Sequence, residues 1–220
     1  MEAEAFERTE RTRVRRKPER GVYDRAAVAA ILDEALYCHV ATVEDGRPRA
    51  IPTIHVRIDD TVYIHGSTGS RTLRGVRGGQ EVCLVVTLLD ELVFARSAAH
   101  HSMNYRSVVV YGTAQEVTDT DEKWRAQTAL VDHVCAGRAT QARMPNDKEL
   151  RETMILAIPL REASAKVRTG PPLDDEEDVE LPIWAGVLPL RMVPQPALDA
   201  PDLPSGLSVP PNVARYRRPG

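Results

Sequence analysis

The sequence predicts a single, mainly β domain with flanking helices and extended tails, in which the strands curl into a barrel. Strand-like runs follow one another from Tyr37 onward, and turn residues separate them. They are not divided by regular crossover helices, and no Gly-x-Gly-x-x-Gly occurs, so a doubly wound parallel sheet fits poorly. A chain of 220 residues can bury one substantial core, which leaves one domain plus tails.

The composition divides the chain into three parts. Residues 1–20 are rich in Glu and Arg with almost no apolar residues, and they predict a flexible, solvated arm. Residues 21–170 form the barrel domain. Residues 171–220 contain an acidic run and many prolines, so we expect an extension that packs partly on a dimer.

The domain opens with a helix and a three-stranded meander. Asp24 is a good N-cap for an amphipathic helix over Arg25 to Leu36. Strands are expected over Tyr37 to Val43, Arg49 to Ile58 and Thr61 to His65, with turns at residues 44–47 and 59–60. This meander supplies the first half of the barrel.

A short helix and two long strands continue the barrel. The helix spans Ser70 to Val76 and ends at Gly78-Gly79. The strands Glu81 to Ala95 and Tyr105 to Val117 form the wall. We expect, last, a helix over Thr118 to Val134, a helical turn over Asp147 to Glu152 and a closing strand over Met154 to Leu160.

Charge and cysteine content narrow the class of function. The formal net charge of -3 gives no electrostatic reason to expect a nucleic acid or a membrane surface as partner. Three widely spaced cysteines, Cys38, Cys83 and Cys135, indicate reduced core residues in a cytoplasmic protein. No run approaches the roughly 20 apolar residues of a membrane span, and the N-terminus lacks the apolar core of a secretion signal. A small-molecule ligand or a protein partner fits better.

Small hydroxyl-bearing residues and an arginine follow the strand that begins at Thr61. The segment Tyr63-Ile64-His65-Gly66-Ser67-Thr68-Gly69-Ser70-Arg71 joins a strand end to a helix start. Free backbone N–H groups, the positive end of the helix dipole, two serine hydroxyls and the arginine together suit a phosphate. The same residues also suit an ordinary strand-to-helix turn in which Ser70 is only the N-cap.

Several blocks of the sequence resemble one family. They are the opening helix around Ile31-Leu32, His39 to Val43, Pro52-Thr53, Tyr63 to Arg71 and His101 to Gly112. These blocks resemble the pyridoxamine 5'-phosphate oxidase-like superfamily of FMN-binding split β-barrels and, within it, the nitroimidazole-resistance proteins. The resemblance implies a split β-barrel that works as a homodimer.

The resemblance also implies an FMN site where the two subunits meet. It places the 5'-phosphate at Ser70 and Arg71, close to Gly66 and Ser67, and the isoalloxazine along Pro52 and Thr53. Tyr105, Arg106 and Ser107, contributed across the interface, would line the other side. His65 would lie beside the reactive edge of the flavin and act as the catalytic residue, because an imidazole titrates near neutral pH. The alternative is that His65 only hydrogen-bonds the loop that follows it.

The sequence departs from the pyridoxamine phosphate oxidases at two points. Ile51 to His55 stand where their second strand usually offers a basic pair to the phosphate, and their C-terminal arginine motif has no clear match. Both departures argue against pyridoxamine phosphate as the substrate.

The segment from Ser164 to Gly186 keeps residues that can bind a ligand. Lys166 and Arg168 would face anionic ligand groups, and Trp184 would supply a stacking plate over the flavin or the partner subunit. The alternative is a surface connection whose cations are solvated.

Six histidines raise the question of a metal or a haem. Adjacent His100 and His101 would point to opposite faces of a strand, and no metal-binding spacing accompanies them, so we expect no metal site. Haem stays open because one axial histidine suffices.

The function that the resemblance implies is an FMN-dependent oxidoreductase. We expect it to take electrons from a reduced nicotinamide and to pass them to a small, planar, electron-poor substrate, such as a nitro-aromatic compound. A non-catalytic flavin or haem binding protein and a deazaflavin-dependent reductase are the alternatives.

Overall fold

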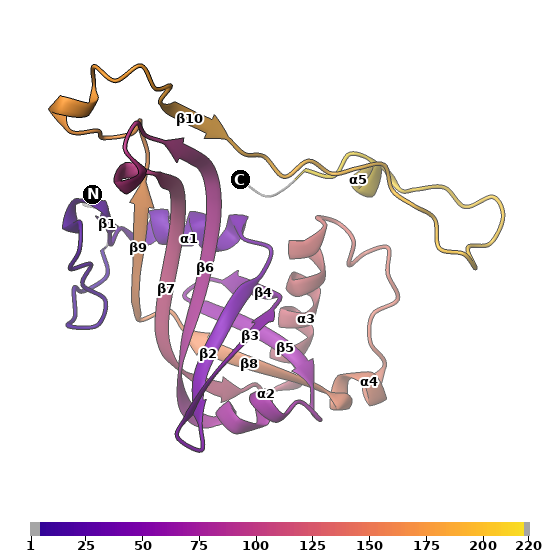
Figure 1. Ribbon diagram of the computed structural model, residues 1–220. Coiled ribbons are helices and arrows are strands. Elements are labelled where there is room, and N and C mark those ends of the chain that lie inside the picture. The colour runs from indigo at the N-terminus through magenta and orange to yellow at the C-terminus, as the bar shows by residue number, and fades with distance from the viewer. Residues whose placement is uncertain (1–4, 218–220) are drawn as a thin grey trace.

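The protein is described here by a computed structural model, which covers residues 5–217. Its strands form one antiparallel sheet that curls into a half-open barrel (Figure 1). The strand order is β3-β2-β6-β7-β8-β5-β4, with β9 also pairing β7 and β10 also pairing β6. The predicted fold class, a mainly β split barrel with flanking helices, is confirmed.

The element bounds follow the chain. The strands are β1 (Gly21–Val22), β2 (Cys38–Glu44), β3 (Arg47–Thr53), β4 (His55–Ile58), β5 (Thr61–Ser67), β6 (Gly78–Phe94), β7 (Ser102–Glu116), β8 (Thr153–Pro159), β9 (Glu162–Arg168) and β10 (Gly186–Pro189). The helices are α1 (Arg25–Glu34), α2 (Arg71–Val76), α3 (Thr120–Val134), α4 (Asp147–Glu152) and α5 (Pro211–Ala214). Short 3-10 turns lie at Pro18–Arg20, Ala98–His100 and Glu176–Asp178.

Helices α1 and α3 begin at N-cap residues that the sequence predicts. The Asp24 carboxylate accepts a hydrogen bond from the Ala27 N–H at 2.7 Å, and the Asp119 carboxylate accepts one from the Glu122 N–H at 2.8 Å. Each cap satisfies one of the backbone donors that a helix start leaves unpaired. The predicted starts of α1 and α3 are therefore correct to within two residues.

Two clusters of buried side chains fill the molecule. The larger lies inside the barrel, where Val28, Ile31 and Leu32 of α1 pack with residues from the long strands. The smaller lies between α3 and the β4–β5 pair and holds Val56, Tyr63, Val117, Ala126, Leu130 and Ile155. α3 accordingly stands against the outer side of this half of the sheet (Figure 1).

The barrel splits where the sequence predicts one continuous strand over Arg49 to Ile58. The chain leaves β3 at Thr53 and enters β4 at His55, and these two strands are the opposite ends of the strand order. A period-two pattern runs through both strands, so it does not reveal that the chain changes its partner strand at Ile54.

The N-terminal segment, predicted as a solvated arm, is packed on the domain over its described residues. Phe6 is buried in the larger cluster, and its N–H donates to the Tyr23 carbonyl at 2.8 Å. The Arg25 guanidinium lies over the Phe6 ring, 4.2 Å from its centroid. Further along, Arg11 pairs with Glu81 and Glu162. A buried aromatic side chain, together with ion pairs and the bond from the Val14 N–H to the Tyr23 hydroxyl, therefore holds a segment that is otherwise charged.

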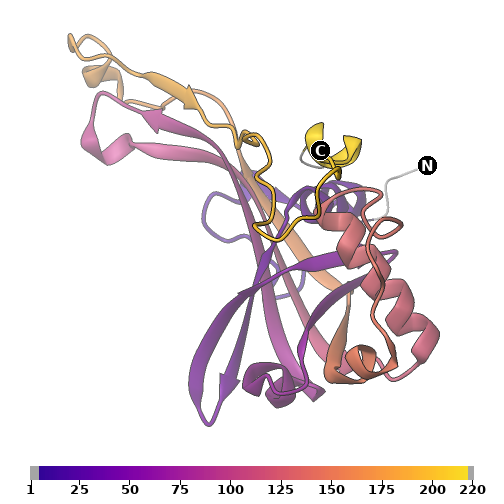
Figure 2. The ribbon, with the colours of Figure 1, turned by 90° about the vertical axis from the view of Figure 1, so that its right-hand side faces the viewer.

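The C-terminal extension runs over the long strands and then back toward α3. β10 runs beside the last residues of β6 (Figure 2). Gly186 lies opposite Phe94 in this pair. Near the end of the chain, the Asn212 side chain donates to the Ala136 carbonyl at 3.0 Å. Between these two attachments the segment exposes several large apolar residues, which are Leu190, Met192, Val193, Leu198, Leu203 and Leu207.

Cys38, Cys83 and Cys135 are all free thiols. Burial raises the pKa of the Cys38 thiol to about 12, so this cysteine is an inert core residue. Over residues 5–217, no helix is long and apolar enough to cross a membrane.

Candidate functional site

The predicted site residues fall into two groups in the structure. The first gathers where β3 and β5 end and α2 begins, and the Thr53 hydroxyl there lies 3.5 Å from the His65 carbonyl, to which it donates. This group holds Pro52, Thr53, His65, Gly66, Ser67, Ser70 and Arg71. The second lies on β7, β9 and the segment before β10, and it holds Tyr105, Arg106, Ser107, Lys166 and Trp184.

The polar residues of the predicted phosphate loop already have partners within the chain. The Ser70 hydroxyl caps α2 by accepting from the Leu73 N–H at 3.4 Å, and the Ser67 hydroxyl accepts from the Gly69 N–H at 3.1 Å. Arg71 Nε donates to Glu44 Oε1 at 2.8 Å and holds the pKa of that carboxyl below its usual range. A phosphate at this loop would compete with Glu44 for Arg71.

Gly66 has a packing role that the sequence does not reveal. A Cβ added at this position would lie 2.6 Å from Leu73 Cδ1, on the buried side of α2. The absence of a side chain therefore lets α2 pack closely on the end of β5. This contact fixes the position of the loop between β5 and α2 whether or not a ligand binds to it.

His65 is a half-buried imidazole on a rigid strand. Its Nδ1 atom is buried and has no hydrogen-bond partner within the described residues. Burial lowers the pKa of His65 below the usual 6.5, so the ring is neutral at neutral pH. A neutral imidazole with an unpartnered nitrogen can accept or donate one hydrogen bond from a ligand, depending on its tautomer.

Part of the second group, together with Arg168, lines one face of the β7–β9 pair. Tyr105 lies opposite Arg168, and Ser107 lies opposite Lys166, whose carbonyl accepts from the Ser107 hydroxyl at 3.2 Å. Residues two apart on paired strands share a face, so these four side chains face the same way.

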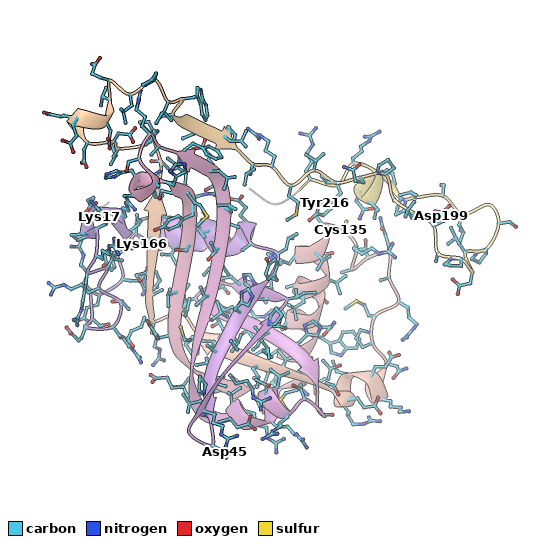
Figure 3. The ribbon with its side chains drawn as sticks, viewed as in Figure 1. Lys17, Asp45, Cys135, Lys166, Asp199 and Tyr216 are labelled. Carbon is cyan, nitrogen blue, oxygen red and sulfur yellow. The ribbon has the colours of Figure 1, made fainter. Side chains whose placement is uncertain are left out.

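A cleft of about 540 Å³ opens beside Lys166 and Arg168, and cations from separate parts of the chain line it. The N-terminal segment adds Arg16, Lys17 and Arg20. Figure 3 shows Lys17 and Lys166 close together on this side of the domain. The remaining lining residues are Ala99, His100, His101, Ser102 and Leu173, so no carboxylate lines the cleft.

Arg106 belongs to a different groove, of about 850 Å³, between the end of α1, β6 and residues 189–194. Its guanidinium donates to both Asp90 oxygens, at 3.0 and 2.8 Å, and to the Glu34 carboxylate. These two carboxylates neutralise the charge of Arg106, so it offers no free cation to a phosphate. The groove is also lined by apolar residues that include Leu36, Tyr37, Leu88 and Leu89, and by the polar residues Thr87, Glu91 and Arg191.

Trp184 is placed to contact a ligand or a partner. Its side chain is 70% exposed, and its ring lies tilted against Phe94 with 5.9 Å between the centroids. Phe94 also meets His101 edge-on at 6.0 Å. An exposed aromatic plate therefore stands one ring away from a histidine of the cationic cleft.

Any haem would need a histidine nitrogen as a ligand, so the contacts of the six histidines matter. His55 and His133 use Nε2 on the Leu32 and Ala35 carbonyls, and His100 lies 3.2 Å from Asp175. The remaining three are His65, described above, His101 and His39, an exposed residue on β2 next to the Tyr37 ring. Among residues 5–217, no three His, Cys, Asp or Glu side chains gather as a metal site would require.

Sequence reasoning identified Lys166 and Arg168 but missed the other cations of the cleft. Arg16, Lys17 and Arg20 come from the segment read as a solvated arm, where a run of basic residues surrounds Pro18. That basic run was the sequence signal that could have identified these cations. The role of these cations depends on the tertiary fold, because the pairing of β1 with β9 places Gly21, the residue after Arg20, opposite Lys166.

The antiparallel half-barrel, with its added β9 and β10 strands, has the architecture of the split-barrel proteins. The family model of pyridoxamine 5'-phosphate oxidase matches residues 24–167, and the chain belongs to this family.

Two solved structures match almost the whole chain. The flavocytochrome Anf3 from Azotobacter vinelandii is 38% identical, covers 95% of this chain and 97% of its own, and gives a TM-score of 0.89. The FAD and heme binding protein from Mycobacterium smegmatis is 36% identical, covers 88% of this chain and 95% of its own, and gives a TM-score of 0.84.

A more distant match shares the fold. A protein from Bacteroides thetaiotaomicron, assigned to 5-nitroimidazole antibiotic resistance, is 21% identical over 67% of this chain and 86% of its own, with a TM-score of 0.56. No curated protein matches the sequence.

Proposed function

We propose that the protein is a flavocytochrome, an electron-transfer oxidoreductase that binds a flavin and a haem. One observation carries the proposal: the flavocytochrome Anf3 is similar over 95% of this chain, far beyond the family match at residues 24–167. The similarity therefore includes the N-terminal segment and the C-terminal extension, which supply parts of both grooves. The FAD and heme binding protein supports the same proposal independently.

The residues present fit a flavin. The cationic cleft offers counter-charges for phosphate groups, and Trp184 offers an exposed ring for stacking. We propose FAD in preference to the FMN that the sequence resemblance implies, because two phosphates suit a cleft with five cations better than one.

The residues present also fit a haem. His39 and His101 are exposed imidazoles with a free nitrogen, and either could serve as the axial ligand. The groove beside Tyr37 combines apolar side chains with charged ones and could accept a planar macrocycle against its apolar part, since His39 lies against the same tyrosine ring.

The two groups would supply the electron-transfer chemistry when bound, the flavin by hydride or single-electron steps and the haem by single-electron steps. The chain contributes position and environment. Its cations hold anionic groups, the apolar side chains of the groove at Tyr37 cover a ring, and His65 can hold a proton near the end of β5. We further propose a small, planar, electron-poor molecule as the substrate and a reduced nicotinamide as the donor.

The test is anaerobic mixing of the purified protein with reduced nicotinamide. A flavocytochrome bleaches its flavin absorption and then develops the spectrum of reduced haem. If flavin bleaches but no haem signal exists, the protein is a flavin reductase alone. If the flavin and haem spectra both stay unchanged with reduced nicotinamide and with dithionite, the proposed electron-transfer function is wrong.

The role of His65 is tested by its replacement with glutamine. Gln keeps a hydrogen-bonding group of similar reach but cannot exchange a proton near neutral pH. If His65 takes part in the chemistry, His65→Gln retains its flavin and loses the acid limb of the rate–pH profile that lies below 6.5, where the histidine titrates. A variant rate with the wild-type pH profile would show that His65 is only structural.

We also propose that the protein is a homodimer. α2, which begins at Arg71, leads directly into Gly78 of β6, whereas Tyr105 pairs with Leu89 of the same strand. At roughly 3.3 Å per residue, Gly78 and Leu89 lie about 35 Å apart along β6. One ligand can therefore contact both the Arg71 loop and Tyr105 only if the two come from different subunits. Light scattering at micromolar concentration should give twice the mass of one chain. A single-chain mass would end this proposal.

A further inference from the structure

The cationic cleft holds charges that the chain does not neutralise. Over residues 5–217, none of Arg16, Lys17, Arg20, Lys166 and Arg168 forms an ion pair. Elsewhere, by contrast, Arg11, Arg57, Arg71 and Arg106 all pair with carboxylates. Like charges gathered without counter-ions repel one another, so an arrangement of this kind indicates an anionic ligand.

Among the five cations of the cleft, Arg168 is the one that is buried, with only 6% of its surface exposed. Its guanidinium donates to Asn104 Oδ1 and to the Gly170 and Pro171 carbonyls, at 3.4 and 3.3 Å for the carbonyls, and all three acceptors are neutral. Burial lowers the pKa of Arg168 and the charge of Arg20 lowers it further, while Tyr105 and Glu91 raise it in part. A buried cation whose direct hydrogen bonds go only to neutral groups is stabilised when an anion binds to it.

The backbone holds Lys17 and Arg20 in defined positions. Lys17 adopts a left-handed conformation, with φ of 58°, immediately before the 3-10 turn that ends at Arg20. This conformation is unfavourable for a lysine and persists only where surrounding contacts impose it. Because Phe6 and Tyr23 anchor the segment on both sides of the turn, Arg16, Lys17 and Arg20 stay opposite β9.

The size and charge of the cleft define the class of ligand. Its volume of about 540 Å³ lies within the usual range for pockets that bind small molecules. A single carboxylate would leave most of the five cations without a partner. Two linked phosphates present several charges and many acceptor oxygens, and the Ala99 and Leu173 side chains leave an apolar patch beside them.

We propose that this cleft binds the diphosphate of a nucleotide. Two sources share this chemistry, the adenosine diphosphate half of bound FAD and that of a reduced nicotinamide dinucleotide. The first source rests on the flavin proposed above, whereas the second requires only that the cleft exists. Arg20 precedes Gly21, which lies opposite Lys166 in the β1–β9 pair, so the experiment replaces these two lining cations from the N-terminal segment and β9.

The experiment compares wild type with Arg20→Ala/Lys166→Ala and with the control Arg13→Ala. Both target side chains are partly exposed, so the double variant should fold, and its melting temperature checks this. Arg13 is an exposed cation of the same segment that does not line the cleft. For each purified protein, calorimetry measures the binding of ADP, and chromatography of the released cofactor measures the content of FAD and FMN.

Three outcomes decide the proposal. If the double variant loses FAD or carries FMN instead, the cleft holds the diphosphate of the flavin. If it keeps its flavin but binds ADP at least about tenfold more weakly, as expected on loss of charge-assisted hydrogen bonds, the cleft holds a separate nucleotide. If neither quantity differs from that of wild type and Arg13→Ala, the proposal is overturned. A wild type without any flavin would contradict the proposed flavocytochrome, while its ADP binding would still test the cleft.

Discussion

Acidification from neutral pH to about pH 4 is expected to destabilise the fold by about 3 kcal/mol through His55 alone. The His55 side chain is fully buried, and its Nε2 lies 3.0 Å from the Leu32 carbonyl, to which it donates. Its Nδ1 is buried without a partner, so a second proton there would have no acceptor. The fold therefore accepts only the neutral ring.

The sign of this effect follows from the two pKa values. Burial, opposed in part by the bond to Leu32, lowers the pKa of His55 from 6.5 to about 4. The neighbouring His133, whose ring centroid lies 5.4 Å away, lowers it further, and Asp33 raises it slightly. The unfolded chain thus binds a proton before the folded one does. Stability is complete above about pH 6.5 and falls as the pH approaches 4.

Denaturant unfolding at a series of pH values measures this effect. Carboxylates also titrate in this range, so the informative quantity is the difference between wild type and His55→Gln. Gln can still donate to the Leu32 carbonyl but cannot take up a proton. The variant should lose less free energy of unfolding on acidification, by about 3 kcal/mol. Parallel curves for the two proteins would show that His55 does not control the acid response.

Replacement of Phe6 by alanine is expected to cost about 3 to 5 kcal/mol, the usual range for a buried phenylalanine. Phe6 is 3% exposed and packs in the main core cluster, with the Arg25 guanidinium over its ring. Its removal leaves a cavity at the point where the N-terminal segment is attached. The segment can also detach, so the loss observed should lie toward the lower end of this range.

Two measurements check the attachment. Chemical denaturation compares Phe6→Ala with Phe6→Leu, which keeps most of the apolar volume and should cost much less. Limited trypsin digestion should cut Phe6→Ala faster at Arg13 to Arg20, because loss of the Phe6 anchor leaves this stretch with only its polar attachments, such as the Arg11 ion pairs and the bond from the Val14 N–H to the Tyr23 hydroxyl. Equal stability and equal cleavage in wild type and Phe6→Ala would contradict the packed segment. Faster cleavage should also coincide with a weakened cationic cleft.

Much of the fold follows from local sequence signals. Helix caps, turn residues and long apolar runs predict α1, α3, α4 and the strands β2, β5, β6, β7 and β8. The strand β9 is different, because its central residues Ala163, Ser164 and Ala165 are small and have weak strand preference. They become buried only because β9 lies between β1 and β7. No local pattern contains that information.

The candidate site is harder to predict for the same reason. The Tyr63 to Arg71 loop is contiguous in the sequence, so its small and polar residues could be recognised together. The cationic cleft is assembled from residues 16–20, 99–102, 166–168 and 173, which meet only after the barrel has closed and Phe6 is seated. Likewise, nothing in the sequence shows that Glu44 pairs with Arg71, or that Glu34 and Asp90 neutralise Arg106.

The most direct test of the flavocytochrome proposal is the cofactor content of the protein as purified from cells supplied with haem precursor. The absorption spectrum should show flavin bands together with the Soret band of haem, and chromatography of the released flavin should identify FAD. His39→Ala and His101→Ala then distinguish the two candidate axial ligands, since only the true ligand shifts the Soret band when replaced. A protein that contains neither flavin nor haem, and takes up neither when they are added, would contradict the proposed function.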